Sequence, residues 1–311
     1  MVRQMTHQIY IKLGGVVDNK NITRLITGTI MGFIMLFSLL SGGLSLFLVT
    51  LLIVILATRE YVCILKHKGF YPSIKVILFA DAFLAVLAYL NRFNMVSFAL
   101  TVCSITAFMW VLFKGRQPYI ANVATTILGF VYGGLFPLYL IFLRDIGSHP
   151  VYPYFLKVTG ECPGKGFVLL IFFSILVTDT GCYYFGSKFG KHKLAPIISP
   201  NKTIEGALGG TLCAILMSLL IGYMIQLPVY HSIIAAILIA LFAQIGDLCE
   251  SLIKRDAGVK DSGNTLPGHG GFLDRTDSYV FTLPVLYYYF QYVVYNPNTI
   301  ASIKSFIQGM L

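Results

Sequence analysis

SGGLSLFLVTLLIVILAT (Ser41–Thr58) decides what kind of protein this chain can be. After its two glycines the run contains no acidic or basic residue, and a helix of this length, at about 1.5 Å per residue, crosses most of the ~30 Å hydrocarbon core of a bilayer. The whole chain of 311 residues is 57% hydrophobic and only 12% charged, with a mean hydropathy of +0.78. Such a composition lies outside the range of soluble globular domains and is typical of a polytopic α-helical membrane protein.

Further apolar segments lie on both sides of this run. Hydropathy predicts nine membrane spans in total, and the fold class that we expect is therefore an all-α, polytopic transmembrane protein. The first two spans nearly touch at Ser41-Gly42-Gly43, so they are expected to form a tight hairpin. The nine predicted ranges are 25–41, 43–58, 74–90, 95–113, 120–143, 166–186, 204–226, 229–253 and 278–295.

Basic residues are distributed unevenly between the two sides of this predicted topology. All but five of the 23 basic residues lie on one side, and the five on the other are Arg92, Arg144, Lys157, Lys165 and Lys304. By the positive-inside rule the richer side faces the cytoplasm, which puts the N-terminus inside and the C-terminus outside the cytoplasmic membrane. Because the net charge of +10 is dispersed over short loops and forms no separate basic domain, we expect the chain to contact the lipid bilayer and not nucleic acid.

Asp81 is the exception in a first half that has few charges within its spans. One interpretation makes it a substrate or proton site. The other makes it a carboxylate that packs between helices and pairs with a neighbour such as Lys75 or Arg92. The second interpretation is favoured, because no companion motif surrounds Asp81.

Beyond residue 165 the polar residues become frequent. They gather at the cytoplasmic helix ends and in two cytoplasmic loops, 187–203 and 254–277. We therefore divide the chain into N-terminal membrane helices with an outer loop (1–165) and a second membrane region, with these two loops, that carries the chemistry (166–311).

The cytoplasmic end of the eighth span carries acidic residues at helical spacing. Asp247, Glu250 and Ser251 stand at i, i+3 and i+4, which places them on one face of a helix. Lys254 follows Glu250 by four residues and can neutralise it, whereas Asp247 is left as a free ligand for a cation. The alternative for Asp247 is an ordinary carboxylate at the membrane interface.

The segment KDSGNTLPGHGGFLDRTDS (260–278) supplies more carboxylates. Asp274 and Asp277 are three residues apart, as on a first helical turn, and Asp179 near the end of the sixth span faces the same side. Carboxylates that leave room for water and phosphate oxygens suit Mg²⁺, whereas zinc-type Cys and His clusters and an HExxH motif are absent from the sequence. The metal ligands that we expect are Asp179, Asp247, Asp274 and Asp277.

Bases and glycines surround these acids. They are Lys254, Arg255, Lys260, Arg275, Gly268, Gly270 and Gly271. The glycines let the backbone approach an anion closely, and the bases can neutralise it. Acids, bases and glycines at the entrance of a helix together predict a site for a metal ion and a polyphosphate.

The loop 187–203 has related chemistry. Ser199 can cap a helix and Pro200 can occupy its first position, so that the positive end of the helix dipole lies beside Lys202. Such an arrangement binds phosphate; the alternative is a positively charged cytoplasmic loop that ends in a good cap. The phosphate-loop pattern GxxxxGK[ST] occurs nowhere in the sequence, which argues against a nucleotide hydrolase of that kind.

Two blocks of residues resemble a known family. The first runs from Ser251 to Asp277 and contains Lys254-Arg255, Lys260-Asp261, Leu266-Pro267, His269-Gly270-Gly271-Phe272 and Asp274-Arg275-Thr276-Asp277. Its spacing is similar to the signature of the phosphatidate cytidylyltransferases, also called CDP-diacylglycerol synthases. The second block, Asp179-x2-Cys182-Tyr183-x2-Gly186 and then Ser199-Pro200-Asn201-Lys202-Thr203-x-Glu205-Gly206, resembles another part of that family, with Cys182 where a small residue such as alanine is expected. The resemblance is specific over about 179–277 and generic in the first half.

The resemblance implies a reaction in which CTP and phosphatidic acid give CDP-diacylglycerol and pyrophosphate. It further implies that Mg²⁺ is required, that a monovalent cation such as K⁺ lies beside it, and that the protein is a homodimer. The catalytic residues would be Asp247, Lys254, His269, Asp274, Arg275 and Asp277. The substrate would be bound by Ser199, Asn201, Lys202, Thr203, Glu205, Lys254, Arg255, Lys260, Asp261, Gly270, Gly271 and Arg275.

For His269 we favour a hydrogen bond to phosphate or to a metal-bound carboxylate. A phosphate nucleophile is already an anion, so it needs no general base.

Two other functions compete with this one. A transporter or flippase for anionic lipids would also carry charges within its spans, but its charges mark a path near the midplane, and it is built from repeats that this sequence lacks. Another CTP-dependent enzyme acting on an isoprenoid or ether lipid would share the same motifs.

Overall fold

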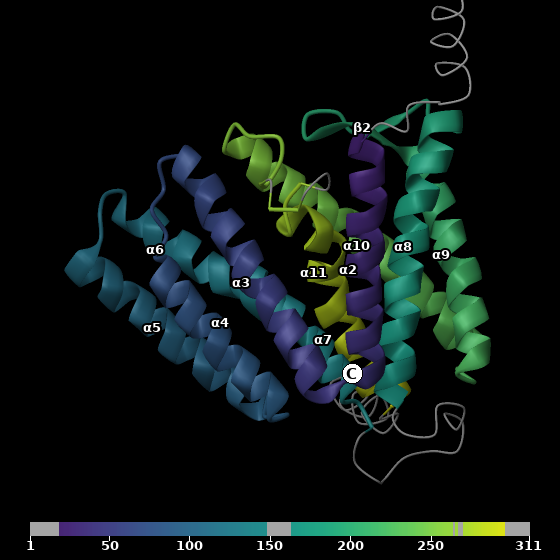
Figure 1. Cartoon of the computed structure of the whole chain (residues 1–311), viewed down its shortest axis with the longest axis horizontal. Helices are drawn as coiled ribbons and strands as arrows, with labels where there is room; N and C mark the ends of the chain where they lie inside the picture. The colour runs from purple at the N-terminus through teal and green to yellow at the C-terminus, as the bar shows by residue number, and fades with distance from the viewer. Residues whose placement is uncertain (1–18, 148–162, 264, 267–269, 296–311) are drawn as a thin grey trace, which may run out of the picture.

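The computed structural model describes residues 19–147, 163–263, 265–266 and 270–295 (Figure 1). As predicted, most of these residues are helical; a small β-hairpin is the exception to the all-α class. The helices are α2 (Asn19–Ser41), α3 (Gly43–His67), α4 (Ile74–Tyr89), η1 (Phe93–Met95), α5 (Val96–Lys114), α6 (Tyr119–Leu128), η2 (Gly129–Leu135), α7 (Phe136–Arg144), α8 (Pro163–Phe189), α9 (Ile204–Met224), α10 (Val229–Asp256), α11 (Leu273–Tyr289) and η4 (Phe290–Val294). The strands are β1 (Lys193–Ala195) and β2 (Ser199–Thr203).

Helices lie at all nine predicted ranges, several of them longer than predicted. Within the described residues, six are long and apolar enough to cross a membrane: Gly43–His67, Phe93–Lys114, Tyr119–Arg144, Pro163–Phe189, Ile204–Met224 and Val229–Asp256. Ile26–Ser41 is a shorter apolar helix. The chain is therefore a mostly helical protein with several segments able to span a bilayer.

The predicted hairpin between the first two helices is present. Helix α2 ends at Ser41 and α3 begins at Gly43, and Gly42 adopts a φ of 65°, a conformation that glycine reaches without steric cost. The buried guanidinium of Arg144 closes this turn, because its Nε donates a hydrogen bond of 3.0 Å to the carbonyl of Leu39, one of the last carbonyls of α2.

Asp81 is fully buried in α4, but its partner differs from the prediction. Its Oδ2 accepts a hydrogen bond of 2.7 Å from the hydroxyl of Thr58 on α3. The expected pairing with Lys75 or Arg92 was wrong: the ammonium of Lys75 lies over the ring of Trp110 instead. Asp81 thus joins two helices through a hydrogen bond, which offsets part of the cost of burying its carboxyl group.

The main hydrophobic core joins the two predicted regions of the chain. It contains buried residues of α2, α3, α4, α5 and α7 together with residues of α8, α10, α11 and η4. One contact within it is the stacked pair Phe167 and Phe290, whose ring centroids are 4.0 Å apart. Figure 1 shows α8 and α9 side by side at one end of the molecule and α4, α5 and α6 at the other, with α10 and α11 between them. The core therefore holds α10 and α11 at the centre, where the polar residues gather.

Candidate active site

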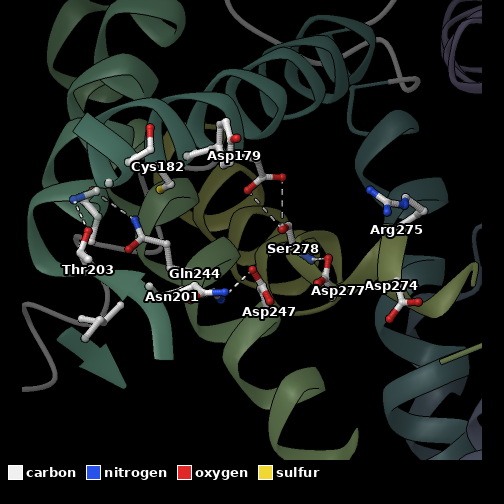
Figure 2. A pocket seen from close by; sticks show the side chains of 17 residues that line it. Asp179, Cys182, Asn201, Thr203, Gln244, Asp247, Asp274, Arg275, Asp277 and Ser278 are labelled. Atoms are coloured by element: carbon white, nitrogen blue, oxygen red, sulfur yellow. Dashed lines mark hydrogen bonds and ion pairs between the residues drawn. The ribbon is translucent and has the colours of Figure 1, made fainter. Parts of the chain in front are cut away.

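A cavity of about 580 Å³ lies among α8, α9, α10, α11 and the β-hairpin. The lining residues are Asp179, Cys182, Tyr183, Gly186, Ser187, Leu194, Asn201, Lys202, Thr203, Gly206, Ala207, Gln244, Asp247, Asp274, Arg275, Asp277 and Ser278. All four predicted metal ligands, which come from three helices, therefore line one space. Figure 2 shows Asp179, Asp247, Asp277 and Ser278 close together, with Asp274 and Arg275 to one side.

The β-hairpin forms one wall of the cavity. Its second strand occupies the segment where we expected a helix to begin at Ser199. Ser199 pairs with Ala195, and Thr203 pairs with Lys193, so residues 199–203 are an extended strand. Helix α9 begins only at Ile204, and the hydroxyl of Thr203 caps it by accepting a 3.2 Å hydrogen bond from the N–H of Gly206. The prediction that Ser199 caps a helix with Pro200 at its first position was wrong, because strand pairing extends this segment up to the residue that directly precedes the helix.

Asp179 and Asp277 approach each other through Ser278. The hydroxyl of Ser278 donates to the carboxylate of Asp179, with 3.4 Å to each oxygen. The N–H of the same serine donates a 2.6 Å hydrogen bond to Oδ1 of Asp277. Ser278 thus brings one carboxylate of α8 and one of α11 to the same part of the cavity (Figure 2).

Helices α10 and α11 meet at Gly246. A Cβ atom on this glycine would lie 2.3 Å from the backbone oxygen of Asp277, so only a residue without a side chain permits the approach. Asp247 is the next residue and is therefore held beside Asp277 at the helix crossing. It is not the free ligand that we expected, because the ammonium of Lys202 lies 2.6 Å from its Oδ2.

Lys254 contacts two acids, Glu250 and Asp274. Only the contact with Glu250 was predicted, from the spacing of four residues. Its ammonium contacts the fully buried carboxylate of Glu250 one helical turn away, and this predicted pair is confirmed. The same ammonium lies 2.6 Å from Oδ1 of Asp274. Asp274 also accepts hydrogen bonds from the N–H of Ser262 (3.1 Å) and of Gly271 (3.0 Å). Burial alone would raise the pKa of Asp274. The Lys254 ammonium and the Gly271 N–H have the larger combined effect and lower this pKa to about 2.

The structure does not bring every predicted substrate-binding residue to the cavity. Arg255 is exposed, and its Nε donates to the carbonyl of Ile198, which ties the end of α10 to the hairpin. The carboxylate of Glu205 accepts bonds from the backbone N–H groups of Lys191 and His192. The predicted residues that do not line the cavity are Ser199, Glu205, Lys254, Arg255, Lys260, Asp261, Gly270 and Gly271. His269 lies outside the described residues.

Three polar residues near the acids were not predicted as site residues. Gln244 and Ser278 line the cavity, and each lies close in the sequence to an acid that was predicted, which is the signal that could have found them. Glu60 of α3 accepts hydrogen bonds from the backbone at the start of α11. Nothing in the sequence near Glu60 indicates a partner so far along the chain.

The acids of the cavity fit a divalent cation bound together with phosphate. Within the described part of the chain, no three acid, histidine or cysteine side chains are grouped so that they alone would hold a metal ion. Mg²⁺ commonly takes only one or two carboxylates and fills its other positions with phosphate oxygens and water. Asp179, Asp247 and Asp277 all offer carboxylate oxygens to one cavity, so the donor set suits Mg²⁺ when a polyphosphate is also present.

Comparison with known proteins gives consistent matches over most of the chain. Residues 22–293 match the Cytidylyltransferase family. A protein of Synechocystis named phosphatidate cytidylyltransferase is 35% identical over 283 residues, covering 86% of this chain and 96% of the relative. Proteins of the same name from Staphylococcus saprophyticus and Staphylococcus epidermidis are 35% and 36% identical over 271 and 274 residues, each covering 85% of this chain and 96% of the relative.

Proposed function

The chain belongs to the Cytidylyltransferase family, and from this we infer that it is a phosphatidate cytidylyltransferase. It transfers CMP from CTP to phosphatidic acid and releases pyrophosphate, forming CDP-diacylglycerol. The observation that carries this function is the cavity in which Asp179, Asp247, Asp274 and Asp277 meet two bases, Lys202 and Arg275.

The reaction exchanges one phosphorus–oxygen bond for another. An oxygen of the lipid phosphate attacks the α-phosphorus of CTP, and the bond from that phosphorus to the oxygen bridging toward the β-phosphorus breaks. The electron pair of that bond leaves with pyrophosphate. Negative charge develops on the phosphate oxygens in such a transfer, so catalysis depends on fixed positive groups that are aimed at them.

Lys202 and Arg275 are the bases that line the cavity and can contact these phosphate oxygens. Lys202 enters from β2 and already faces Asp247 across the space, so it is held close to where a polyphosphate would lie. Lys254 has a different role, because its ammonium is engaged by Glu250 and Asp274. It orients Asp274, and it neutralises a carboxylate that would otherwise be buried without a counter-charge.

Mg²⁺ would be held by one or two of the four carboxylates, those of Asp179, Asp247, Asp274 and Asp277. When bound, it would neutralise charge on the α-phosphate and on the leaving pyrophosphate. Asp274 already has contacts with Lys254, Ser262 and Gly271 on its own side of the cavity. Asp247 has one ion-pair contact, with Lys202, which itself lines the cavity, so Asp179, Asp247 and Asp277 are the better-placed ligands. A monovalent cation such as K⁺ would occupy a neighbouring position.

We place the cavity on the cytoplasmic side of the bacterial inner membrane, in a protein with nine spans, an inner N-terminus and an outer C-terminus. Support comes from the contacts among three loops that are rich in basic residues. Lys68 at the end of α3 pairs with Asp256 at the end of α10, and Arg255 contacts the hairpin. These loops thus share one end of the molecule, as the positive-inside rule requires.

The protein would act as a homodimer.

The experiment is to purify the protein into lipid nanodiscs and to measure pyrophosphate release from CTP. Release that depends on both phosphatidic acid and Mg²⁺ is the expected result. A lipid transporter would move labelled lipid without consuming CTP, and that outcome would overturn the proposal. Isoprenoid phosphates and ether-lipid phosphates assayed in parallel identify the lipid acceptor.

A further inference from the structure

Glu60 of α3 is buried where the first half of the chain meets the active-site loop. Only 6% of its surface is exposed. Its Oε1 accepts hydrogen bonds from the hydroxyl of Thr265 (2.6 Å) and the N–H of Phe272 (3.0 Å). Its Oε2 accepts hydrogen bonds from the hydroxyl of Ser262 (3.1 Å) and the N–H of Leu273 (2.9 Å). Each oxygen thus receives one rotatable donor and one fixed donor.

The two fixed donors are the first N–H groups of α11. Phe272 stands at the cap position of this helix and provides no side-chain hydrogen bond. Helix N-termini leave such N–H groups without partners inside the helix, and a carboxylate there is also favoured by the helix dipole. Glu60 therefore supplies from another helix the cap that the local sequence of α11 does not contain.

The chain leaves space for this carboxylate. A Cβ atom on Gly271 would lie 2.3 Å from Oε2 of Glu60 and 2.0 Å from the hydroxyl oxygen of Ser262. A Cβ atom on Gly263 would lie 3.2 Å from Oε1 of Glu60. The close approach of Glu60 thus explains why residue 271 is a glycine. Neither Gly263 nor Gly271 lines the cavity, so the cavity itself does not require them.

The helix that Glu60 caps carries four residues of the cavity. Asp274, Arg275, Asp277 and Ser278 all lie in the first two turns of α11. Two turns of an α-helix have a fixed geometry, so the position of the first N–H groups sets the position of these side chains. A carboxylate that holds the first turn therefore holds the acids against the cavity.

We propose that Glu60 is a positioning residue for phosphatidate cytidylyl transfer, acting through Ser262, Thr265 and the first turn of α11. The proposal rests on the proposed function for its kinetic effect, whereas the anchoring of the loop rests on contacts alone. Glu60 does not line the cavity. Its role is to fix where Asp274 and Asp277 point.

The first test replaces Glu60 by Gln in the full-length protein in nanodiscs. One oxygen becomes an NH₂ group, which a hydroxyl can accommodate by rotating but which a backbone N–H cannot. We expect kcat for pyrophosphate release to fall at least tenfold, with a modest drop in the unfolding temperature because a buried N–H donor loses its acceptor. Glu60→Asp keeps the charge and both oxygens and should recover part of this loss. The matched control is Asp81→Asn, a buried acid of α4 whose partner is Thr58, and its kcat should stay within about twofold of wild type.

The second test does not depend on turnover. Trypsin cleavage after the exposed Lys260 reports on how firmly the loop is held. Cleavage there should accelerate severalfold in Glu60→Gln, while cleavage after Lys66 and Lys68 stays at the wild-type rate. Thr265→Val, which removes one donor, should accelerate it as well, whereas Thr265→Ser, which keeps the hydroxyl, should not. These two variants decide the question even if Glu60→Gln does not fold.

Two results would overturn the proposal. One is cleavage after Lys260 at the wild-type rate in both Glu60→Gln and Thr265→Val. The other is an equal loss of kcat in Glu60→Gln and Asp81→Asn, which would make Glu60 one buried acid among others. If the wild-type protein releases no pyrophosphate from CTP and phosphatidic acid, the proposed function fails, and the cleavage rates still decide whether Glu60 anchors the loop.

Discussion

The ammonium of Lys202 lies 2.6 Å from Oδ2 of Asp247 and joins strand β2 to helix α10 across the cavity. The pair places a base within reach of any phosphate that Asp247 would help to bind through a metal ion. It also orients the carboxylate before substrate arrives. We therefore expect the reaction to need both residues: Lys202 to contact the phosphate oxygens, and Asp247 to hold the metal ion.

Replacing Lys202 by Met should reduce kcat by about 10²–10³, the usual cost of losing one group that stabilises developing negative charge. The side chain keeps its length, so binding of the lipid tails and the fold of the hairpin should be preserved. Steady-state kinetics with CTP as the varied substrate measure the effect. Lys193→Met, on the neighbouring strand but outside the cavity lining, is the control. Equal losses in the two variants would mean that Lys202 has no special role.

Asp274→Asn should abolish turnover while the protein still inserts into the membrane. The substitution removes the negative partner of Lys254 and weakens acceptance of the N–H groups of Ser262 and Gly271. Its unfolding temperature should fall too, because the largely buried ammonium of Lys254 loses one of its two counter-ions. Activity is measured at saturating Mg²⁺. Near-normal turnover under this condition would contradict the assignment of Asp274 to the active site.

The control for Asp274→Asn is Asp256→Asn. Asp256 also pairs with a lysine, Lys68, at 2.8 Å, but this pair is solvent-exposed. Exposed pairs contribute about 0–1 kcal/mol, so Asp256→Asn should change neither turnover nor unfolding temperature measurably.

Removing divalent cations with EDTA should stop pyrophosphate release, and added Mg²⁺ should restore it. The cavity offers carboxylates and no described cluster of histidine and cysteine ligands, so Zn²⁺ should not substitute well. Asp247→Asn and Asp179→Asn should each raise the Mg²⁺ concentration needed for half-maximal activity. Titration of activity against Mg²⁺ makes the comparison. A protein that stays fully active in EDTA would rule out the proposed metal ligands.

Gly246→Ala should cost both activity and stability. The added Cβ atom would meet the backbone oxygen of Asp277 at 2.3 Å, so α10 and α11 would have to separate. Turnover should fall at least tenfold, and the unfolding temperature should drop. Gly32→Ala in α2 is the matched control, because nothing lies within 4 Å of the added atom and alanine favours the helix. Comparable unfolding temperatures for the two variants would contradict the close approach of the helices.

Sequence reasoning succeeded where the information is local. A helix lies at each predicted range because an apolar run in a bilayer has few alternatives to a helix. The pair of Glu250 with Lys254 follows from their spacing of one turn. The four acids were singled out because they lie in or near polar stretches at helix ends, and the structure places all four at one cavity; their role as metal ligands stays a prediction.

The predictions that failed concern choices that local sequence leaves open. Ser199-Pro200 is compatible with both a helix start and a strand, and pairing with residues 193–195 decides for the strand. Asp247 was expected to be free because its partner, Lys202, belongs to another element. Glu60 was missed because the groups that it binds follow it by 202 to 213 positions. Spacing rules do not reach that far.

That separation bears on how the enzyme is made. During biosynthesis α3 is complete long before the ribosome reaches residues 262–273, so the nascent protein holds the Glu60 carboxylate for most of its synthesis without the donors that it binds in the finished fold. Residues 262, 265, 272 and 273 supply those donors, and Asp274 and Asp277 of α11 follow directly behind them. A truncated product that stops short of residue 262 would thus lack every group that binds Glu60, together with two of the four acids of the cavity.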